Sequence, residues 1–189
     1  MKKIAIFASG NGSNAENICN YFKESLDVKI VLLATNNSKA FVVKRLKNFN
    51  LRVLCFSKEE INDPNIVQKK LSELSIDLIV LCGFLLKIPK NIVSLFPKRI
   101  INIHPSLLPK FGGKGMYGEN VHKAVINSME EFSGITVHYV NNNYDEGDII
   151  FQKKLALSKK ETPQSLSKKI HVLEMSFFPS VIKNVLDSL

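Results

Sequence analysis

The sequence predicts an α/β fold, in which a single Rossmann-like domain holds a mostly parallel sheet flanked by helices. Late antiparallel strands and a long C-terminal helix complete the expected fold. Three observations predict it. Short apolar runs alternate with segments of helical spacing in the first half, two later runs alternate polar and apolar residues, and the last stretch is amphipathic throughout.

Five short apolar runs have the composition of buried strands. A strand that is apolar along its whole length is covered on both faces, as strands of parallel sheets are. The runs are Ile4–Ala8, Val28–Ala34, Arg52–Phe56, Asp77–Cys82 and Arg99–Ile103, of which the third is the weakest.

Three segments between these runs have helical features. Apolar residues recur near helical spacing in Asn14–Leu26. Lys39–Phe49 follows Ser38, a residue type that caps helices, and Pro64–Leu74 places a proline directly after Asp63 as N-cap. Strand and helix therefore alternate, as in a doubly wound domain.

The second half of the chain has a different pattern. Gly134–Val140 and Asp148–Leu157 alternate polar and apolar residues, and the turn residues of Asn141–Gly147 join them, which indicates a hairpin or two adjacent strands. Thr162–Leu189 opens with Thr162 and a proline and has the pattern of one long amphipathic helix. We expect a single domain over residues 1–189, without a linker or an internal repeat.

Length and composition exclude several classes of protein. A chain of 189 residues with 45% hydrophobic residues can bury a core, so disorder does not describe it. No apolar run approaches the roughly 20 residues that span a bilayer, so no membrane partner is expected. The first apolar run is too short for a signal peptide, and the three scattered cysteines fit a reducing, cytoplasmic location.

The charge is strongly positive, with 26 Lys plus Arg against 17 Asp plus Glu and a net charge of +9. The basic residues are scattered and form neither a long run nor a motif interleaved with aromatic residues, so no nucleic-acid partner is expected. A positive field of this kind favours capture of small anionic molecules.

A glycine-rich loop follows the first expected strand. Its sequence, Ser9-Gly10-Asn11-Gly12-Ser13-Asn14-Ala15, opens a helix whose first N–H groups and dipole favour an anion. It also matches the dinucleotide fingerprint, which requires a carboxylate after the next strand, where Asn36 and Asn37 stand instead. A single bound phosphate is the favoured interpretation, with dinucleotide binding or a turn without a ligand as the alternatives.

A second motif, Asn102-Ile103-His104-Pro105-Ser106-Leu107-Leu108-Pro109, ends the fifth expected strand. Open α/β sheets place their ligand sites at such carboxyl ends. Asn102 and His104 share one side of the strand, since side chains alternate. An amide donor beside an imidazole suits a developing oxyanion, although a single histidine at a strand end is commonly structural.

A third motif supplies a carboxylate in the turn between the two alternating runs. Asp145 is a candidate to hold the ring of His104 and raise its pKa, with Gly147 permitting a tight backbone. Sequence spacing does not establish the contact, and a turn rich in carboxylates is usually solvated.

Together these pieces resemble the phosphoribosylglycinamide formyltransferases, folate-dependent enzymes of purine synthesis. The resemblance covers nearly the whole chain and implies the formyltransferase fold and a one-carbon group transferase. It rests on the loop at residues 9–14, Gly83-Phe84-Leu85, the motif at residues 102–109, the segment 112–118, His138 and Tyr144-Asp145-Glu146-Gly147.

In that family the formyl group passes from 10-formyltetrahydrofolate to the amine of glycinamide ribonucleotide. The resemblance implies that Asn102, His104 and Asp145 are catalytic, that Gly12, Ser13 and Asn14 bind the substrate phosphate, and that Glu174 contacts the glycinamide substrate. It also implies a folate site formed by Leu85, Leu86, Lys87, Ile88, Asn102, Asn141, Asn142, Asn143, Tyr144 and Asp145. No metal and no covalent enzyme intermediate are implied, and the enzyme is expected to be a monomer or a homodimer.

Four other classes are disfavoured. Methionyl-tRNA formyltransferases and formyltetrahydrofolate deformylases share the histidine motif but carry an extra domain, for which 189 residues leave no room. A nicotinamide-dependent reductase lacks its carboxylate at Asn36-Asn37, and a nucleic-acid binder lacks a basic motif.

Overall fold

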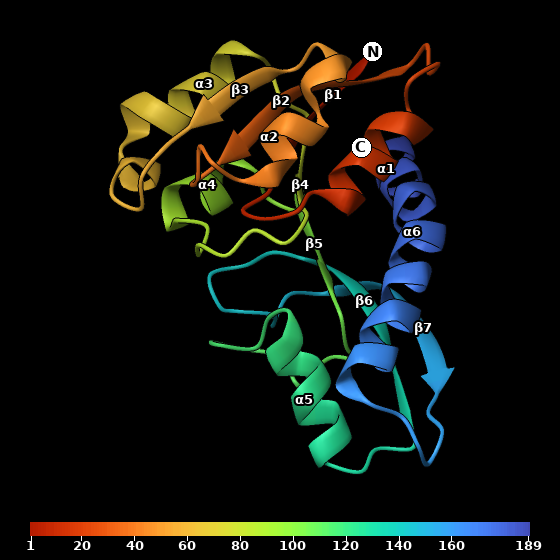
Figure 1. The fold of residues 1–189 in the computed structure, drawn as a ribbon. Coiled ribbons are helices and arrows are strands. Elements are labelled where there is room, and N and C mark those ends of the chain that lie inside the picture. The colour runs from red at the N-terminus through yellow and green to blue at the C-terminus, as the bar shows by residue number, and fades with distance from the viewer. The chain divides into compact units, whose positions relative to one another are not determined.

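The computed structural model describes residues 1–189, and its seven strands form one mixed sheet in the order β3-β2-β1-β4-β5-β6-β7 (Figure 1). By its internal contacts the chain divides into two compact units, Met1–Ile101 and Asn102–Leu189. Strand β5 (Ile100–His104) begins in the first unit and ends in the second. No helix combines the length and the apolar character that crossing a bilayer requires.

The first unit contains the parallel part of the sheet. Strand β1 (Lys2–Phe7) pairs in parallel with β2 (Val28–Thr35) and with β4 (Leu78–Leu81), and β2 pairs in parallel with β3 (Arg52–Cys55). Residues Ile4–Phe7 are fully buried, which confirms the strands expected from continuous apolar runs. Strand β3 differs, because it lies at the sheet edge and three of its four residues are exposed.

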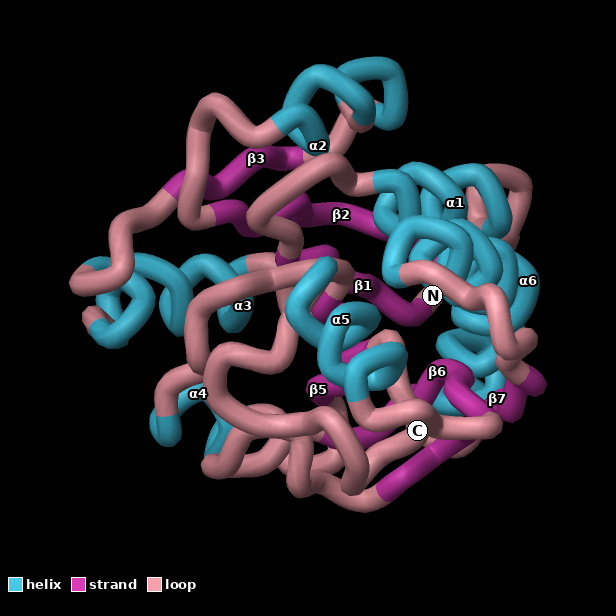
Figure 2. The backbone as a smooth tube through the Cα atoms, turned by 60° about the horizontal axis from the view of Figure 1, so that its bottom comes forward, coloured by secondary structure: helices cyan, strands magenta, loops and turns pink.

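The helices of the first unit are α1 (Ser13–Tyr21), α2 (Phe41–Arg45), α3 (Lys69–Glu73) and α4 (Lys90–Leu95). Successive strands run outward from β1 to β3 and then return through β4, so right-handed crossovers place α1 and α2 on one face and α3 and α4 on the other (Figure 2). Helix α1 contacts α2, and the π-helical turn Pro64–Gln68 contacts both α3 and α4.

Short helical turns complete this unit at Lys47–Phe49 and Glu60–Asn62. The expected cap at Asp63 is confirmed, since its side chain accepts a 2.8 Å hydrogen bond from the backbone N–H of Asn65.

Two expected helix boundaries are wrong for local reasons. Helix α1 stops near Tyr21, because Ser25 bonds Asp27 and accepts the N–H of Val28 in a turn that leads into β2. Ser38 is not a cap, since α2 begins after Ala40 and Asn37 accepts the N–H of Lys39 in an Asx turn.

The second unit is built on a hairpin and two helices. Strands β6 (Phe132–Tyr139) and β7 (Ile149–Ala156) pair antiparallel, which confirms the expected hairpin. Helix α6 (Pro163–Asp187) confirms the long C-terminal helix and packs on β6, β7 and α5 (Glu119–Asn127) (Figure 1). Helices α4 and α5 were not expected, because six and nine residues give too few turns for a clear periodic signal.

Helix α6 starts with a capping box, whose contribution to stability can be measured. Thr162 Oγ1 accepts the N–H of Ser165 at 3.1 Å, and Ser165 Oγ accepts the N–H of Thr162 at 2.9 Å. We expect Thr162→Ala to lower the free energy of unfolding by about 1 kcal/mol, because the helix loses this cap. Urea denaturation measures the change, and Thr162→Ser, which keeps the hydroxyl, serves as the matched control. Equal stability of the two variants would contradict the role of the cap.

Candidate active site

In the first unit, the glycine-rich loop forms the N-terminus of α1. Gly12 is the N-cap residue at φ 79°, and a Cβ at this position would lie 2.3 Å from Val42 Cγ2, so only glycine fits. No side chain caps the helix, and a helix N-terminus favours an anion. Arg45 lies beside this loop and donates to Asn11 O at 3.0 Å and to Asn11 Oδ1 at 2.7 Å.

The position that would carry the carboxylate of a dinucleotide site has a structural role instead. Ser9 Oγ donates to Asn36 Oδ1 at 2.5 Å and accepts the N–H of Leu85 at 3.0 Å. Asn36 therefore holds the start of the loop, which agrees with the weak case for a dinucleotide.

In the second unit, His104 ends β5 and is 3% exposed, while Asn102 is partly exposed. The ring nitrogen Nε2 of His104 lies 2.8 Å from the carbonyl oxygen of Phe111, which can only accept, so Nε2 carries a proton. The strand and one backbone carbonyl thus fix the ring in place.

The loop that supplies this carbonyl is held by a buried threonine. Thr136 Oγ1 accepts the N–H of Leu108 at 3.0 Å and donates to Ser106 O at 2.7 Å. Gln152 Nε2 adds bonds to Leu108 O at 3.0 Å and to Thr136 Oγ1 at 2.9 Å. These bonds tie the motif after His104 to strands β6 and β7, so the proline-rich loop is firmly positioned.

Asp145 lies between two imidazoles, those of His104 and His138. The sequence suggested only the first of these neighbours. Its Oδ2 accepts the N–H of Gly113 at 2.9 Å and lies 3.6 Å from His104 Nδ1, while its Oδ1 lies 3.6 Å from His138 Nε2. Asp145 adopts φ 56°, in the left-handed region. Gly147 permits the turn, since a Cβ there would lie 1.8 Å from Tyr139 O.

Burial dominates the electrostatics of His104. It lowers the pKa of the imidazole below its ordinary value, because the charged ring loses hydration. Asp145 raises this pKa, as expected, and the Phe111 carbonyl does so too, but the net shift is downward. Burial alone would raise the pKa of the Asp145 carboxyl, yet the two neighbouring imidazoles and the Gly113 N–H hold it below its usual range.

His138 is also part of this cluster, although the sequence assigned it no contact with the other three residues. It is 2% exposed on β6, and its Nε2 lies 3.1 Å from the Asn102 side-chain nitrogen. Two features of the sequence pointed to it: the resemblance rests partly on His138, and Thr136 and His138 point to the same face of the alternating strand. The structure thus gathers Asn102, His104, Asp145 and His138.

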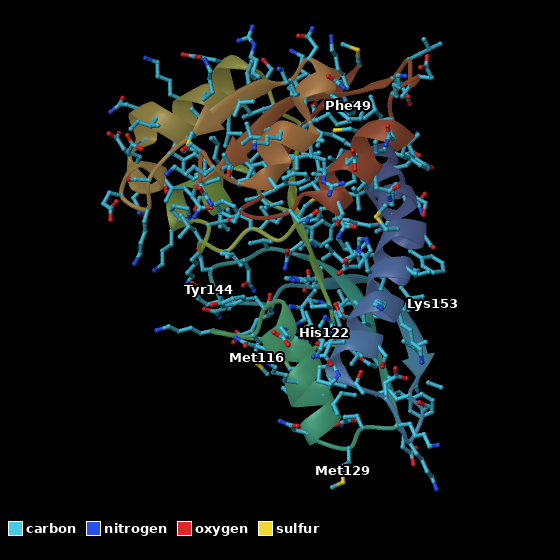
Figure 3. The ribbon with its side chains drawn as sticks, in the orientation of Figure 1. Phe49, Met116, His122, Met129, Tyr144 and Lys153 are labelled. Atoms are coloured by element: carbon cyan, nitrogen blue, oxygen red, sulfur yellow. The ribbon has the colours of Figure 1, made fainter.

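A third buried histidine, His122, was not expected. It lies on α5 (Figure 3), is 5% exposed, and its Nδ1 has no hydrogen-bond partner. Burial lowers its pKa, which the Glu174 carboxylate partly offsets. Glu174 on α6 also raises the pKa of His104, so this residue lies within electrostatic reach of both rings.

The residues expected to bind folate differ in exposure. In the first unit, Leu85 is 51% exposed after β4, whereas Ile88 is buried. In the second unit, Asn141–Tyr144 form an exposed turn, in which Asn141 Oδ1 accepts the N–H of Asn143 at 2.8 Å (Tyr144 is labelled in Figure 3). No group of three or more His, Cys, Asp or Glu side chains is arranged to hold a metal ion.

Comparison with known proteins identifies the family of this chain. The family model described as formyl transferase matches residues 2–182. The chain belongs to the formyl transferase family. Within this family it is 37% identical to phosphoribosylglycinamide formyltransferase of Bacillus subtilis, over 98% of this chain and 95% of that protein.

Solved structures of the formyl transferase family have the same fold. The crystal structure of phosphoribosylglycinamide formyltransferase from Bacillus halodurans superposes with a TM-score of 0.88 at 32% identity, covering 98% of this chain and 95% of that chain. A chloroplastic phosphoribosylglycinamide formyltransferase of Arabidopsis thaliana is 39% identical over 96% of this chain. The chain spans 64% of that protein's length and 60% of its counterpart from Vigna unguiculata.

The buried histidines predict how stability depends on pH. Burial lowers the pKa of both His104 and His122, so the unfolded chain binds protons first as the pH falls below about 6.5. Their contribution to stability is therefore present above that pH and is lost on acidification. When the pH is lowered from 7 to 5, we expect the free energy of unfolding of His122→Leu to fall by less than that of the wild type.

Urea denaturation at a series of pH values measures this difference. Between pH 7 and pH 8.5 the histidines stay neutral, so the two proteins should show parallel curves there. If the two curves of unfolding free energy against pH also run parallel below pH 6.5, protonation of His122 does not destabilise the protein and the prediction is wrong.

Proposed function

We propose that this chain transfers the formyl group of 10-formyltetrahydrofolate to the amine of glycinamide ribonucleotide in purine biosynthesis. The amine nitrogen bonds to the formyl carbon, and the bond from that carbon to the folate nitrogen breaks. The surplus proton of the amine ends on the folate nitrogen, which gives formylglycinamide ribonucleotide and tetrahydrofolate.

The observation that carries the proposal is the gathering of Asn102, His104 and Asp145 at the end of β5 in a formyl transferase chain. Attack on a formyl carbon puts negative charge on its oxygen. In our proposal the Asn102 amide donates to that oxygen, and the His104 imidazolium stabilises it and supplies the proton of Nδ1, since Nε2–H is bonded to Phe111 O. Because burial lowers the pKa of His104, the imidazolium is a stronger acid than a solvated one.

Asp145 has two roles in the proposed mechanism. Its carboxylate raises the pKa of His104 against the effect of burial, so that a fraction of the ring is protonated when the oxyanion forms. The N–H of Gly113 fixes Oδ2 on the side of the ring that carries Nδ1. Asp145 therefore orients His104 as well as charging it.

The phosphate of the ribonucleotide is proposed to bind at Gly12, Ser13 and Asn14. This assignment is supported by the helix N-terminus of α1, which has no side-chain cap and whose dipole favours an anion. We propose that Glu174 contacts the amine end of the same substrate, where a carboxylate attracts the ammonium form and favours its capture.

The pterin is proposed to contact Leu85, Leu86, Lys87 and Ile88 in the first unit, and Asn102 with Asn141–Asp145 in the second. Exposed backbone and apolar side chains at Leu85 and Tyr144 suit a flat heterocycle. We further propose a single catalytic domain that works in the cytoplasm as a monomer or homodimer on small molecules alone, without a metal.

A formyl-transfer assay tests the function directly. The purified chain is incubated with 10-formyltetrahydrofolate and glycinamide ribonucleotide, and tetrahydrofolate release is followed. Water alone and initiator methionyl-tRNA serve as competing acceptors. Release that depends on glycinamide ribonucleotide supports the proposal, whereas release with water alone or with the tRNA would replace it by a hydrolase or a tRNA formyltransferase.

His104 carries the proton chemistry in this proposal. We therefore expect His104→Ala to lower kcat by roughly two to four orders of magnitude, the usual contribution of a general acid. Steady-state kinetics measure the loss, and circular dichroism checks that the variant is folded. Near wild-type turnover would remove His104 from the mechanism.

Asp145 raises the pKa of His104, against the larger effect of burial. Asp145→Asn removes the negative charge that raises the pKa of His104, so this pKa falls further. A general acid loses activity as the pH rises through its pKa, so the descending limb of the kcat profile should move to lower pH, and kcat at neutral pH should fall. An unchanged profile would leave Asp145 as a loop residue only.

A further inference from the structure

His138 is buried beside the proposed reacting groups and has no role in the mechanism above. Its two ring nitrogens both have neighbours within hydrogen-bond distance. Nδ1 lies 2.8 Å from the carbonyl oxygen of Tyr139, and Nε2 lies 3.1 Å from the side-chain nitrogen of Asn102. Asp145 Oδ1 is farther from Nε2, at 3.6 Å.

These neighbours determine the tautomer of His138. A backbone carbonyl oxygen only accepts, so Nδ1 must carry a proton to bond Tyr139. In the neutral ring Nε2 then has a lone pair and acts as an acceptor. The amide nitrogen of Asn102 only donates, so its N–H group completes the pair at 3.1 Å.

This hydrogen bond has a consequence for Asn102. The two ends of a side-chain amide are nearly the same in shape, and only the hydrogen bonds decide which end faces which way. With one hydrogen of the NH2 group given to His138, the amide nitrogen cannot exchange places with Oδ1, and its second hydrogen stays free. Rotation by half a turn would set Oδ1 against the lone pair of Nε2 and present an acceptor to the formyl oxygen.

We propose that His138, in its neutral Nδ1–H form, is a positioning residue that orients the Asn102 amide so that it donates to the reacting oxygen. The role of Asn102 rests on the proposed function, whereas the hydrogen bond itself does not. The distances favour the Asn102 N–H as the partner of Nε2, because the Asn102 nitrogen lies 3.1 Å from it and Asp145 Oδ1 lies 3.6 Å from it.

Two substitutions separate the two nitrogens of His138. His138→Asn places an amide N–H near the position of Nδ1 and keeps the bond to Tyr139 O, but it offers nothing at the position of Nε2. His138→Gln reaches the position of Nε2 with an amide oxygen, which can accept the Asn102 N–H. Thermal unfolding of both variants shows that each is folded.

We expect His138→Gln to keep kcat within about threefold of the wild type. His138→Asn should lose about 10- to 100-fold in kcat, less than the roughly 100- to 1000-fold cost of deleting an oxyanion donor. The KM for glycinamide ribonucleotide should change less than kcat in both variants, since the phosphate loop is untouched. Equal kcat values for the two variants would overturn the proposal.

A measurement on the substrate-free wild type is independent of catalysis. ¹⁵N NMR of labelled protein should show His138 protonated at Nδ1 and bare at Nε2, with a coupling across the hydrogen bond from the Asn102 amide nitrogen. Protonation of Nε2 would overturn the proposal even if the chain is an active formyltransferase. If the wild type proves inactive, the same spectrum still decides whether His138 orients Asn102.

Discussion

The carboxylate of Asp145 is the constraint on which the second unit's site depends. It accepts one backbone N–H, from Gly113, and stands 3.6 Å from an imidazole on each side. Its burial is tolerated because polar neighbours, among them the Gly113 N–H and the His104 ring, hold the pKa of the carboxyl low. The left-handed backbone at Asp145 and the glycine at Gly147 are the local conditions for this placement.

The two histidines beside that carboxylate are held in different ways and are suited to different tasks. His104 is bonded through Nε2–H to Phe111 O, whereas His138 is bonded through its Nδ1 to Tyr139 O. The ring of His104 therefore turns its remaining nitrogen to Asp145, and the ring of His138 turns its own to Asn102. Backbone carbonyls thus leave one ring facing a carboxylate and the other facing an amide.

The first unit handles charge by another means. Its glycine-rich loop, Ser9–Asn14, contains no lysine or arginine, and the guanidinium of Arg45 beside it bonds to Asn11 and to Glu16. In the proposed function, the backbone N–H groups at the start of α1 take the phosphate, and the scattered net charge of +9 forms no site of its own. The loop packs closely on Val42, because a Cβ at Gly12 would clash with that side chain.

The sequence by itself determined the buried strands, the hairpin, the long terminal helix, the glycine-rich loop and the shared face of Asn102 and His104, because each is a matter of local pattern. It also pointed to Asp145, although no spacing rule required its contact with His104. Only the tertiary structure decided that burial outweighs Asp145 in setting the pKa of His104, and that His138 pairs with Asn102, 36 residues away. Desolvation and hydrogen bonds between distant strands arise from packing, and no local pattern of residues encodes their balance.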